Sequence, residues 1–491
     1  MGCSFCCTFL PGAICCWQAN GEVLVSMEGF EMIGCIEPKC AADVAFSRLG
    51  LGFEKLDRGA FDPEKAYDKV AALGVKWIRI QSGWARTETR KGVYDFAWLD
   101  SIVDHLIRRG LRPWICLCYG NGLYDERAAQ TFGAVGWPPI YDEESRAAWG
   151  AYVRALVSRY KGRVSDYEVW NEPDGKWCWK AGPSGTEYGD LLAMTARAVR
   201  SADPGARVIG GSVCMRKLSF IDDALRACGK NLPDAITFHE YTADETQVFE
   251  RVRSLKALLR RYDPKITVIQ GESGSQSRRD GEGALNGGAW TPRRQLLRHT
   301  VADLLCGVEF TSYFSALDML EGLNGKVGDK ASYQDYGYFG VLGAEFDENG
   351  VATGEYQPKS SYYAMQNLAS VFEGEWELCD LPLMARVEDS KLTFAQTLKG
   401  KELTGGGFLR ENGAYLYAYW KPCDLMTMEY EGVVTLEVSG LPEVFRLIDP
   451  MDGSVYAVPE KNIERVGEQS FLLHELPARD YPLLLTSGKN F

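Results

Sequence analysis

Short apolar runs alternate with longer amphipathic segments between residues 46 and 372. The runs are rich in β-branched and aromatic residues, which favours strands, whereas the longer segments repeat apolar residues at helical spacing. We expect strands at 47–53, 75–80, 112–119, 167–170, 206–211, 235–241, 265–272 and 308–314. We expect helices at 62–73, 96–109, 146–160, 186–201, 220–228, 247–261, 293–305 and 360–371.

This order predicts an α/β fold, a (β/α)8 TIM barrel over residues 46–372. Right-handed crossovers make the strands parallel, so their C-terminal ends share one face. Long connections follow the third, fourth, seventh and eighth strands, which is typical of a functional face. They span residues 120–144, 174–185, 273–292 and 316–358.

The pattern changes after residue 372 to short strands punctuated by glycine, such as 413–420 and 433–438. Such spacing predicts an accessory all-β domain, a β-sandwich, over residues 373–491. We expect the N-terminal segment 1–45 to join this β-domain rather than the barrel.

The fourth predicted strand ends at Asn171-Glu172-Pro173. Proline has no N–H and restricts the residue before it, so the strand stops there and holds Glu172 at the mouth of the barrel. Trp170 precedes this carboxyl group, and Trp177 follows it closely. Burial among indole rings predicts a raised pKa for Glu172, which would suit a general acid.

A second carboxylate, Glu272, ends the seventh predicted strand and therefore lies at the same face. Glycoside hydrolysis uses such a pair, and retention of configuration needs the two groups about 5–5.5 Å apart. Simpler interpretations exist for each residue alone. Asn-Glu-Pro often just ends a strand, Glu272 could be a surface carboxylate, and Arg79 could be a barrel-interior charge paired with Glu168.

Three motifs carry a resemblance to a known family: Trp-Asn-Glu-Pro at 170–173, Glu272 at the end of its strand, and Tyr-Asp-Phe-x-x-Leu-Asp at 94–100. Over residues 46–372 the chain resembles the retaining glycoside hydrolases of clan A. Within the clan it looks most like family thirty-nine, the β-xylosidase and α-iduronidase group.

The resemblance implies a role for each matching residue. Glu172 would be the acid/base and Glu272 the nucleophile. Asn171 would bind the sugar 2-hydroxyl, and Arg79 would support the nucleophile. His239 or Tyr241 would contact nucleophile and substrate.

Further residues are candidates for binding the sugar. Glu54, which ends the first strand, could accept hydrogen bonds from hydroxyl groups, although an ion pair with Arg48 or Arg58 is an alternative. The clan commonly has a tryptophan at the end of strand eight, where this chain offers Tyr313 and Phe314, and Trp290 could take its place. The remaining candidates leave strands three and four: Tyr119, Asn121, Trp137, Trp177 and Trp179.

Charge and cysteine content exclude other classes. A formal net charge of −13 would repel nucleic acid. The chain has 15 cysteines, five of them at positions 3, 6, 7, 15 and 16, without a zinc-binding spacing. Four histidines without a His-x-His pair do not favour a metal-dependent hydrolase. We therefore expect no metal and no cofactor.

We find no convincing signal peptide or membrane span, which favours the cytoplasm. The sequence thus predicts a retaining, exo-acting β-glycosidase of the β-xylosidase type with a glycoside or oligosaccharide substrate. A β-glucoside, β-galactoside or α-L-arabinofuranoside substrate, an endo-acting glycanase, and a non-catalytic carbohydrate-binding protein are the alternatives. A homo-oligomer stays open.

Overall fold

The computed structural model describes residues 27–214, 217–242, 244–277, 290–379, 383–390, 403–423 and 430–488. The chain divides into two compact units. One contains the described residues from 38 to 376 together with Pro422 and Cys423. The other contains residues 27–37 and the remaining described residues after 376.

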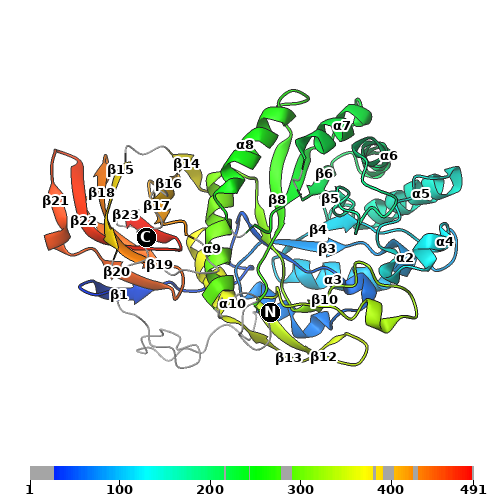
Figure 1. Ribbon diagram of the computed structural model, residues 1–491, viewed down its shortest axis with the longest axis horizontal. Helices are drawn as coiled ribbons and strands as arrows, with labels where there is room; N and C mark the ends of the chain where they lie inside the picture. Colours follow the sequence, from blue (N-terminus) through cyan, green and yellow to red (C-terminus); the bar gives the residue numbers. More distant parts are fainter. Residues whose placement is uncertain are drawn as a thin grey trace. The chain divides into compact units, whose positions relative to one another are not determined.

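The first unit is built on a closed barrel of eight parallel strands, which confirms the predicted TIM barrel (Figure 1). Each strand pairs with its neighbour in the sequence, and the last pairs with the first. The strands are β2 (Leu49–Gly52), β3 (Trp77–Gln81), β4 (Arg112–Leu117), β5 (Asp166–Val169), β6 (Arg207–Val213), β7 (Ala235–His239), β8 (Thr267–Ser273) and β9 (Thr311–Tyr313).

Helices follow the strands as the periodicity predicted. The first of these connections holds a 3-10 turn, η2 (Pro63–Lys65), and α1 (Tyr67–Ala71), and the side chain of Asp62 accepts a bond from the backbone N–H of Glu64 at its start. The others are α3 (Ala97–Arg108), α5 (Glu143–Tyr160), α6 (Gly185–Ala202), α7 (Leu218–Cys228), α8 (Gln247–Leu259), α9 (Trp290–Leu305) and α10 (Ser360–Val371). Asp142 and Ser184 cap α5 and α6, a common use of these residue types.

Large side chains fill the inside of the barrel. Trp77, Trp114, Ile209, Ile269 and Phe310 belong to one buried cluster, contributed by strands or their flanks all around the ring. Trp77 stacks on Phe310 with ring centroids 4.3 Å apart. The interior is therefore a packed core, and the space for a ligand lies beyond the strand ends.

The long connections at the C-terminal ends carry small elements of their own. They are η1 (Leu56–Arg58), α2 (Trp84–Thr87), α4 (Glu126–Ala129), η3 (Phe132–Ala134), β10 (Met319–Leu320), η4 (Lys330–Ser332), β11 (Tyr336–Gly337), β12 (Leu342–Phe346) and β13 (Ala352–Pro358). Two short hairpins, β10 with β11 and β12 with β13, follow the last barrel strand.

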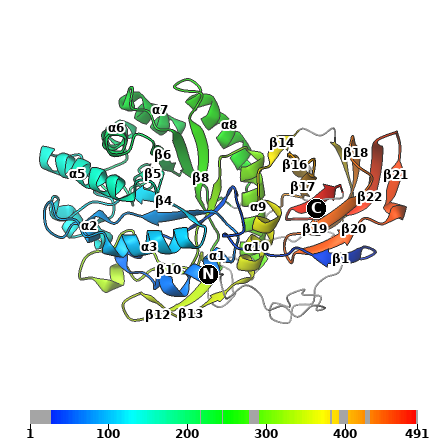
Figure 2. The same cartoon turned by 180° about the vertical axis from the view of Figure 1, so that it is seen from behind.

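The second unit is all β, as predicted, and contains two antiparallel sheets (Figure 2). The larger sheet has the order β1-β20-β19-β23-β17-β16-β14, and the smaller has the order β15-β18-β22-β21. Their strands are β1 (Glu31–Cys35), β14 (Glu377–Cys379), β15 (Leu383–Ser390), β16 (Thr404–Leu409), β17 (Tyr415–Trp420), β18 (Glu431–Ser439), β19 (Phe445–Asp449), β20 (Ser454–Ala457), β21 (Ile463–Arg465), β22 (Ser470–Arg479) and β23 (Leu483–Ser487). A 3-10 turn, η6 (Glu460–Asn462), precedes β21.

Strand β1 comes from the N-terminal segment and pairs with β20 in the larger sheet. Residues 1–26, which include the cysteines at positions 3 to 16, lie outside the described residues. Among the described helices, none combines the length and the apolar character that a bilayer crossing requires.

Candidate active site

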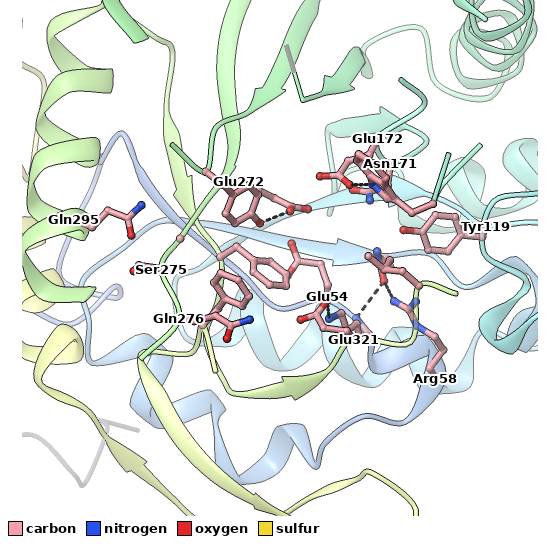
Figure 3. A pocket seen from close by; sticks show the side chains of 18 residues that line it. Glu54, Arg58, Tyr119, Asn171, Glu172, Glu272, Ser275, Gln276, Gln295 and Glu321 are labelled. Carbon is pink, nitrogen blue, oxygen red and sulfur yellow. Dashed lines mark hydrogen bonds and ion pairs between the residues drawn. The ribbon is translucent and has the colours of Figure 1, made fainter. Parts of the chain in front are cut away.

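A cavity of about 630 Å³ opens at the C-terminal ends of the barrel strands (Figure 3). Both predicted carboxylates, Glu172 and Glu272, line it. Of the other predicted site residues, those that also line it are Glu54, Tyr119, Asn171, Trp177 and Tyr241. The cavity therefore lies where parallel strands bring their ends together.

Local backbone geometry brings Glu172 into the cavity. Strand β5 ends at Val169, and Trp170 and Glu172 then adopt positive φ angles of 70° and 45°. These angles are uncommon for residues other than glycine and are costly unless the surroundings hold them. The backbone N–H of Glu172 donates to the carbonyl of Ser212 at 2.9 Å, which ties the turn to β6.

Two donors hold the Glu172 carboxylate. The Trp177 indole N–H donates to Oε2, and Nδ1 of His239 lies 2.9 Å from Oε1. Burial acts to raise the pKa of Glu172, but the hydrogen bond and the charge of His239, with the bond from Trp177, lower it below its ordinary value. The prediction of a raised pKa was wrong, because it counted the burial and not the histidine.

The pKa of His239 moves the opposite way. Burial acts to lower this pKa, but the charge of Glu272 and the bond and charge of Glu172 raise it above its ordinary value. Glu172 and His239 therefore form an ion pair in which the proton rests on the imidazole.

Two side chains donate to Glu272 at the end of β8. Nη1 of Arg79 donates to Oε1, and the Tyr241 hydroxyl donates to Oε2 at 2.7 Å. Nδ1 of His239 lies 3.4 Å from Oε2. Three positive or hydrogen-donating groups thus surround the buried carboxylate of Glu272.

The two carboxylates face each other across the cavity mouth (Figure 3). One carboxylate oxygen of Glu172, one of Glu272 and a ring nitrogen of His239 lie within 4.8 Å of one another. This spacing is close to that of a nucleophile and an acid/base in retaining enzymes, and too short for a water to be held between attacking base and sugar.

Arg79 of β3 connects this pair to the barrel interior. Its fully buried guanidinium donates to Glu168 from Nε at 2.7 Å, and Nη1 lies 3.3 Å from Glu54 besides its bond to Glu272. Nη2 donates to the Asn171 side-chain oxygen at 2.8 Å. Arg79 is thus both a partner of Glu168 and the support of Glu272. The Asn171 amide nitrogen donates to Sγ of Cys178 at 3.6 Å.

Three other predicted residues with described side chains do not line the cavity. Asn121 is buried and donates to the carbonyls of Trp84 and Glu88. Trp137 bonds to Thr131, and Trp179 is fully buried with its indole N–H on Glu187. Their hydrogen bonds hold the loops together. Trp290 begins α9, and its side chain lies outside the described residues.

The cavity also contains polar residues that the sequence did not single out. Gln81, at the end of β3, accepts bonds on Oε1 from the backbone N–H of Lys55 at 3.2 Å and from Arg58. Lys55 also donates to Glu321 at 3.1 Å. The others that line the cavity are Gly274, Ser275, Gln276, Gln295, Leu323 and Phe339, and Phe314, which the sequence had offered at the end of strand eight, lines it as well. Gln81 ends a barrel strand, and the C-terminal ends of the strands share one face, so the sequence could have predicted it. Lys55 and Glu321 come together only through the folding of their loops.

Residues 65–254 match the family model described as glycosyl hydrolases family 39. Over this segment the chain is similar to the glycosyl hydrolases of family 39. The matched segment contains Arg79, Asn171, Glu172 and His239 and stops before Glu272. The nucleophile candidate thus comes from the barrel geometry and not from this match.

Family 39 resemblance extends to two curated β-xylosidases. That of Geobacillus stearothermophilus is 31% identical over 167 residues, which are 31% of this chain and 32% of that protein. That of Caldicellulosiruptor saccharolyticus is 31% identical over 192 residues, 35% of this chain and 38% of that protein. The matches thus span about a third of the length of these relatives.

Solved structures share the fold over most of the chain. A family 39 glycoside hydrolase from Bacteroides cellulosilyticus WH2 superposes with a TM-score of 0.61 at 18% identity, covering 90% of this chain and 81% of that one. A monomeric β-xylosidase from Caulobacter crescentus CB15 has a TM-score of 0.57 at 17% identity, covering 93% and 98%. At such identities the likeness concerns the fold.

Proposed function

We propose that this protein is a retaining glycoside hydrolase that releases a terminal β-linked sugar, with β-xylosides as the leading substrates. The observation that carries the proposal is the approach of Glu172 and Glu272 to within 4.8 Å at the barrel mouth. Double displacement needs two carboxyl groups on opposite sides of one anomeric carbon at about this distance.

In the first step, Glu272 attacks the anomeric carbon while the leaving oxygen takes a proton from Glu172. The glycosidic bond breaks, and a glycosyl ester forms on Glu272. In the second step, Glu172 takes a proton from water, which attacks the same carbon and releases Glu272. The enzyme returns to its starting state, and the sugar keeps its configuration.

The ion pair of Glu172 and His239 supplies the proton for the first step. The proton rests on His239 in the free protein, 2.9 Å from the Glu172 carboxylate. As the sugar displaces water from the cavity, burial penalises the separated charges more strongly, and transfer of the proton to Glu172 becomes easier. Glu172 then presents it to the leaving oxygen.

The neighbours of the pair suit the same reaction. Arg79 and Tyr241 hold the Glu272 carboxylate in position for attack. Asn171, held through its oxygen by Arg79, is placed to direct its amide nitrogen at the 2-hydroxyl beside the anomeric carbon. Hydrogen bonds to this hydroxyl strengthen as positive charge develops on the sugar.

Two observations support a terminal xyloside. The cavity is small enough for one or two sugar rings, since ligand pockets of about 300–1,000 Å³ hold drug-sized molecules. The two curated relatives bear the name β-xylosidase. Because only about a third of each relative is matched, glycosides of other sugars are the direct alternatives as substrates.

A panel of nitrophenyl glycosides tests the proposal: β-xyloside, β-glucoside, β-galactoside and α-L-arabinofuranoside, beside internally linked xylan. We expect fastest release from the β-xyloside and slow or no loss of xylan chain length. Rapid shortening of xylan without release from any aryl glycoside would refute the exo-acting assignment.

Variants of the pair test the roles. Glu272→Gln should lower kcat by about three orders of magnitude or more, and Glu172→Ala should do so for substrates with a poor leaving group. Azide should restore activity of Glu172→Ala and yield a glycosyl azide with retained configuration. The reason is that azide attacks the glycosyl ester on Glu272 from the side that the leaving group has vacated. The matched control Glu464→Gln changes an exposed glutamate of the β unit and should leave kcat unchanged.

A further inference from the structure

A third carboxylate, Glu54, lies beside the catalytic pair without a role in the two steps above. It follows β2, lines the cavity and is 1% exposed. Its Oε1 lies 3.3 Å from Nη1 of Arg79, the same nitrogen that donates to Glu272. One guanidinium nitrogen is therefore shared between two carboxyl groups.

The three acidic partners of Arg79 are not equally provided with donors. Glu168 receives Nε of Arg79 at 2.7 Å and the Thr237 hydroxyl at 2.8 Å. Glu272 receives Nη1 of Arg79 and the Tyr241 hydroxyl. Each of these two carboxyl groups therefore has two side-chain donors.

Glu54 has much less support. Among the described residues, Arg79 provides its side-chain contact, at 3.3 Å from Oε1, and Oε2 is buried without a hydrogen-bond partner. The carboxyl group packs against Gly52, where a Cβ atom would come within 2.4 Å of Oε2, so no donor stands on that side. A buried carboxylate with an unsatisfied oxygen is costly, whereas a carboxylic acid at the same place is not.

The charges around Arg79 lead to the same result. Three carboxylates face one guanidinium, and like charges that share a site do not all ionise. Among the described residues, the other charged groups at the cavity are already paired: Lys55 with Glu321, Arg58 with Asp57, and His239 with Glu172. The group with the fewest donors therefore takes the proton.

We propose that Glu54 is a positioning residue that holds a proton in the active enzyme and thereby leaves Nη1 of Arg79 to Glu272. Burial raises the pKa of Glu54 to about 7, Arg79 opposes the rise, and the charge of Glu272 adds to it, which agrees with this geometry. When Glu54 loses its proton, it competes for Nη1, and Glu272 loses part of its orientation. This inference rests on the proposed function of Glu272 as nucleophile.

The consequence is a step in the pH profile that belongs to neither catalytic carboxylate. We expect kcat/KM of the wild type to fall about tenfold as pH rises through about 7, the effect of losing one charge-assisted hydrogen bond. A bound sugar replaces the water of the cavity that Glu54 lines and thereby raises the pKa of Glu54 further, so the step in kcat should lie at higher pH than the step in kcat/KM.

Glu54→Gln tests the proposal because glutamine has the shape of the protonated side chain and cannot ionise. We expect this variant to keep kcat/KM within about threefold of the wild type near pH 6 and to lack the step near pH 7. Glu54→Ala, which removes the group that fills the space above Gly52, should lose activity both near pH 6 and above pH 7. A Glu54→Gln profile with the step intact, or activity near pH 6 as low as in Glu54→Ala, would overturn the proposal.

A second readout needs no substrate. Infrared difference spectra of the wild type should contain the carbonyl band of a protonated carboxyl group that titrates with a midpoint near 7, and Glu54→Gln should lack it. Asp449→Asn is the matched control, because burial also raises the pKa of Asp449 to about 7 in the β unit. It should remove a different band and leave the kinetic step in place.

The kinetic profile and the infrared spectra together distinguish a failure of the proposed function from a failure of the proposal about Glu54. If every glycoside tested is inert but the Glu54 band titrates as described, the proposed function falls and the proton on Glu54 stands. If the enzyme is active and Glu54→Gln removes no such band, the proposal about Glu54 is wrong.

Discussion

Replacement of Tyr241 by phenylalanine isolates one hydrogen bond of the proposed nucleophile. The hydroxyl donates to Oε2 of Glu272 at 2.7 Å, and the ring contacts Phe314 and Phe339 edge-on at centroid distances of 6.4 and 5.8 Å. Tyr241→Phe removes the donor and leaves these ring contacts. The change therefore probes the chemistry of Glu272 without opening a cavity.

A hydrogen bond to a charged group contributes about 1.5–3 kcal/mol, which corresponds to about a 10- to 150-fold change in rate. We expect kcat/KM for an aryl β-xyloside to fall by a factor in this range. Tyr241 as a whole residue is 38% exposed and lines the cavity rather than the core, so Tm should change by less than about 2 °C.

The assay is steady-state release of nitrophenol together with a thermal melt of the same preparation. Tyr262→Phe is the matched control: its hydroxyl donates to a carboxylate oxygen of Asp222 at 2.5 Å on the outside of the barrel. Unchanged kcat/KM in Tyr241→Phe, or an equal loss in Tyr262→Phe, would refute the assignment of Tyr241 as a partner of the nucleophile.

Three further predictions follow from the site and the β unit. His239→Gln removes the group that holds the proton of the ion pair, so kcat should fall and the basic limb of kcat/KM should no longer follow the raised pKa of His239; an unmoved limb would contradict the ion pair. Asp449 has a pKa raised by burial to about 7, so its contribution to stability is present below its unfolded pKa and is lost as pH rises through about 7. Asp449→Asn should therefore raise the melting temperature of the β unit near pH 8 and not near pH 4, and equal shifts at both would show that its ionisation is not involved. Glu172, His239 and Glu272 could hold a metal ion by their spacing, but Arg79 and the mutual ion pair already compensate their charges, so dialysis against a chelator should leave activity unchanged.

The barrel and the two carboxylates were predictable because they depend on local pattern and on a topological rule. Apolar runs of strand length alternate with helical periodicity, and parallel strands place all their C-terminal ends on one face. Glu172 and Glu272 stand at two such ends, 100 residues apart in the sequence. No loop conformation had to be known to bring them to the same cavity.

Loop residues were predicted less well, because side chains two residues apart can have opposite environments. Trp177 lines the cavity and donates to Glu172, whereas Trp179 is buried with its indole N–H on Glu187. Asn121 likewise serves the backbone of a loop. Composition alone does not distinguish an aromatic wall of a pocket from an aromatic support behind it.

By itself, the sequence determined the ring of strands, the all-β segment after it and the identity of the two facing carboxylates. The tertiary structure decided their electrostatics. His239 lies 67 residues from Glu172 along the chain and reverses the direction in which burial alone would move its pKa. Arg79 divides one guanidinium among Glu54, Glu168 and Glu272. A pKa depends on which charges and donors lie within a few ångströms, and only the folded chain sets those distances.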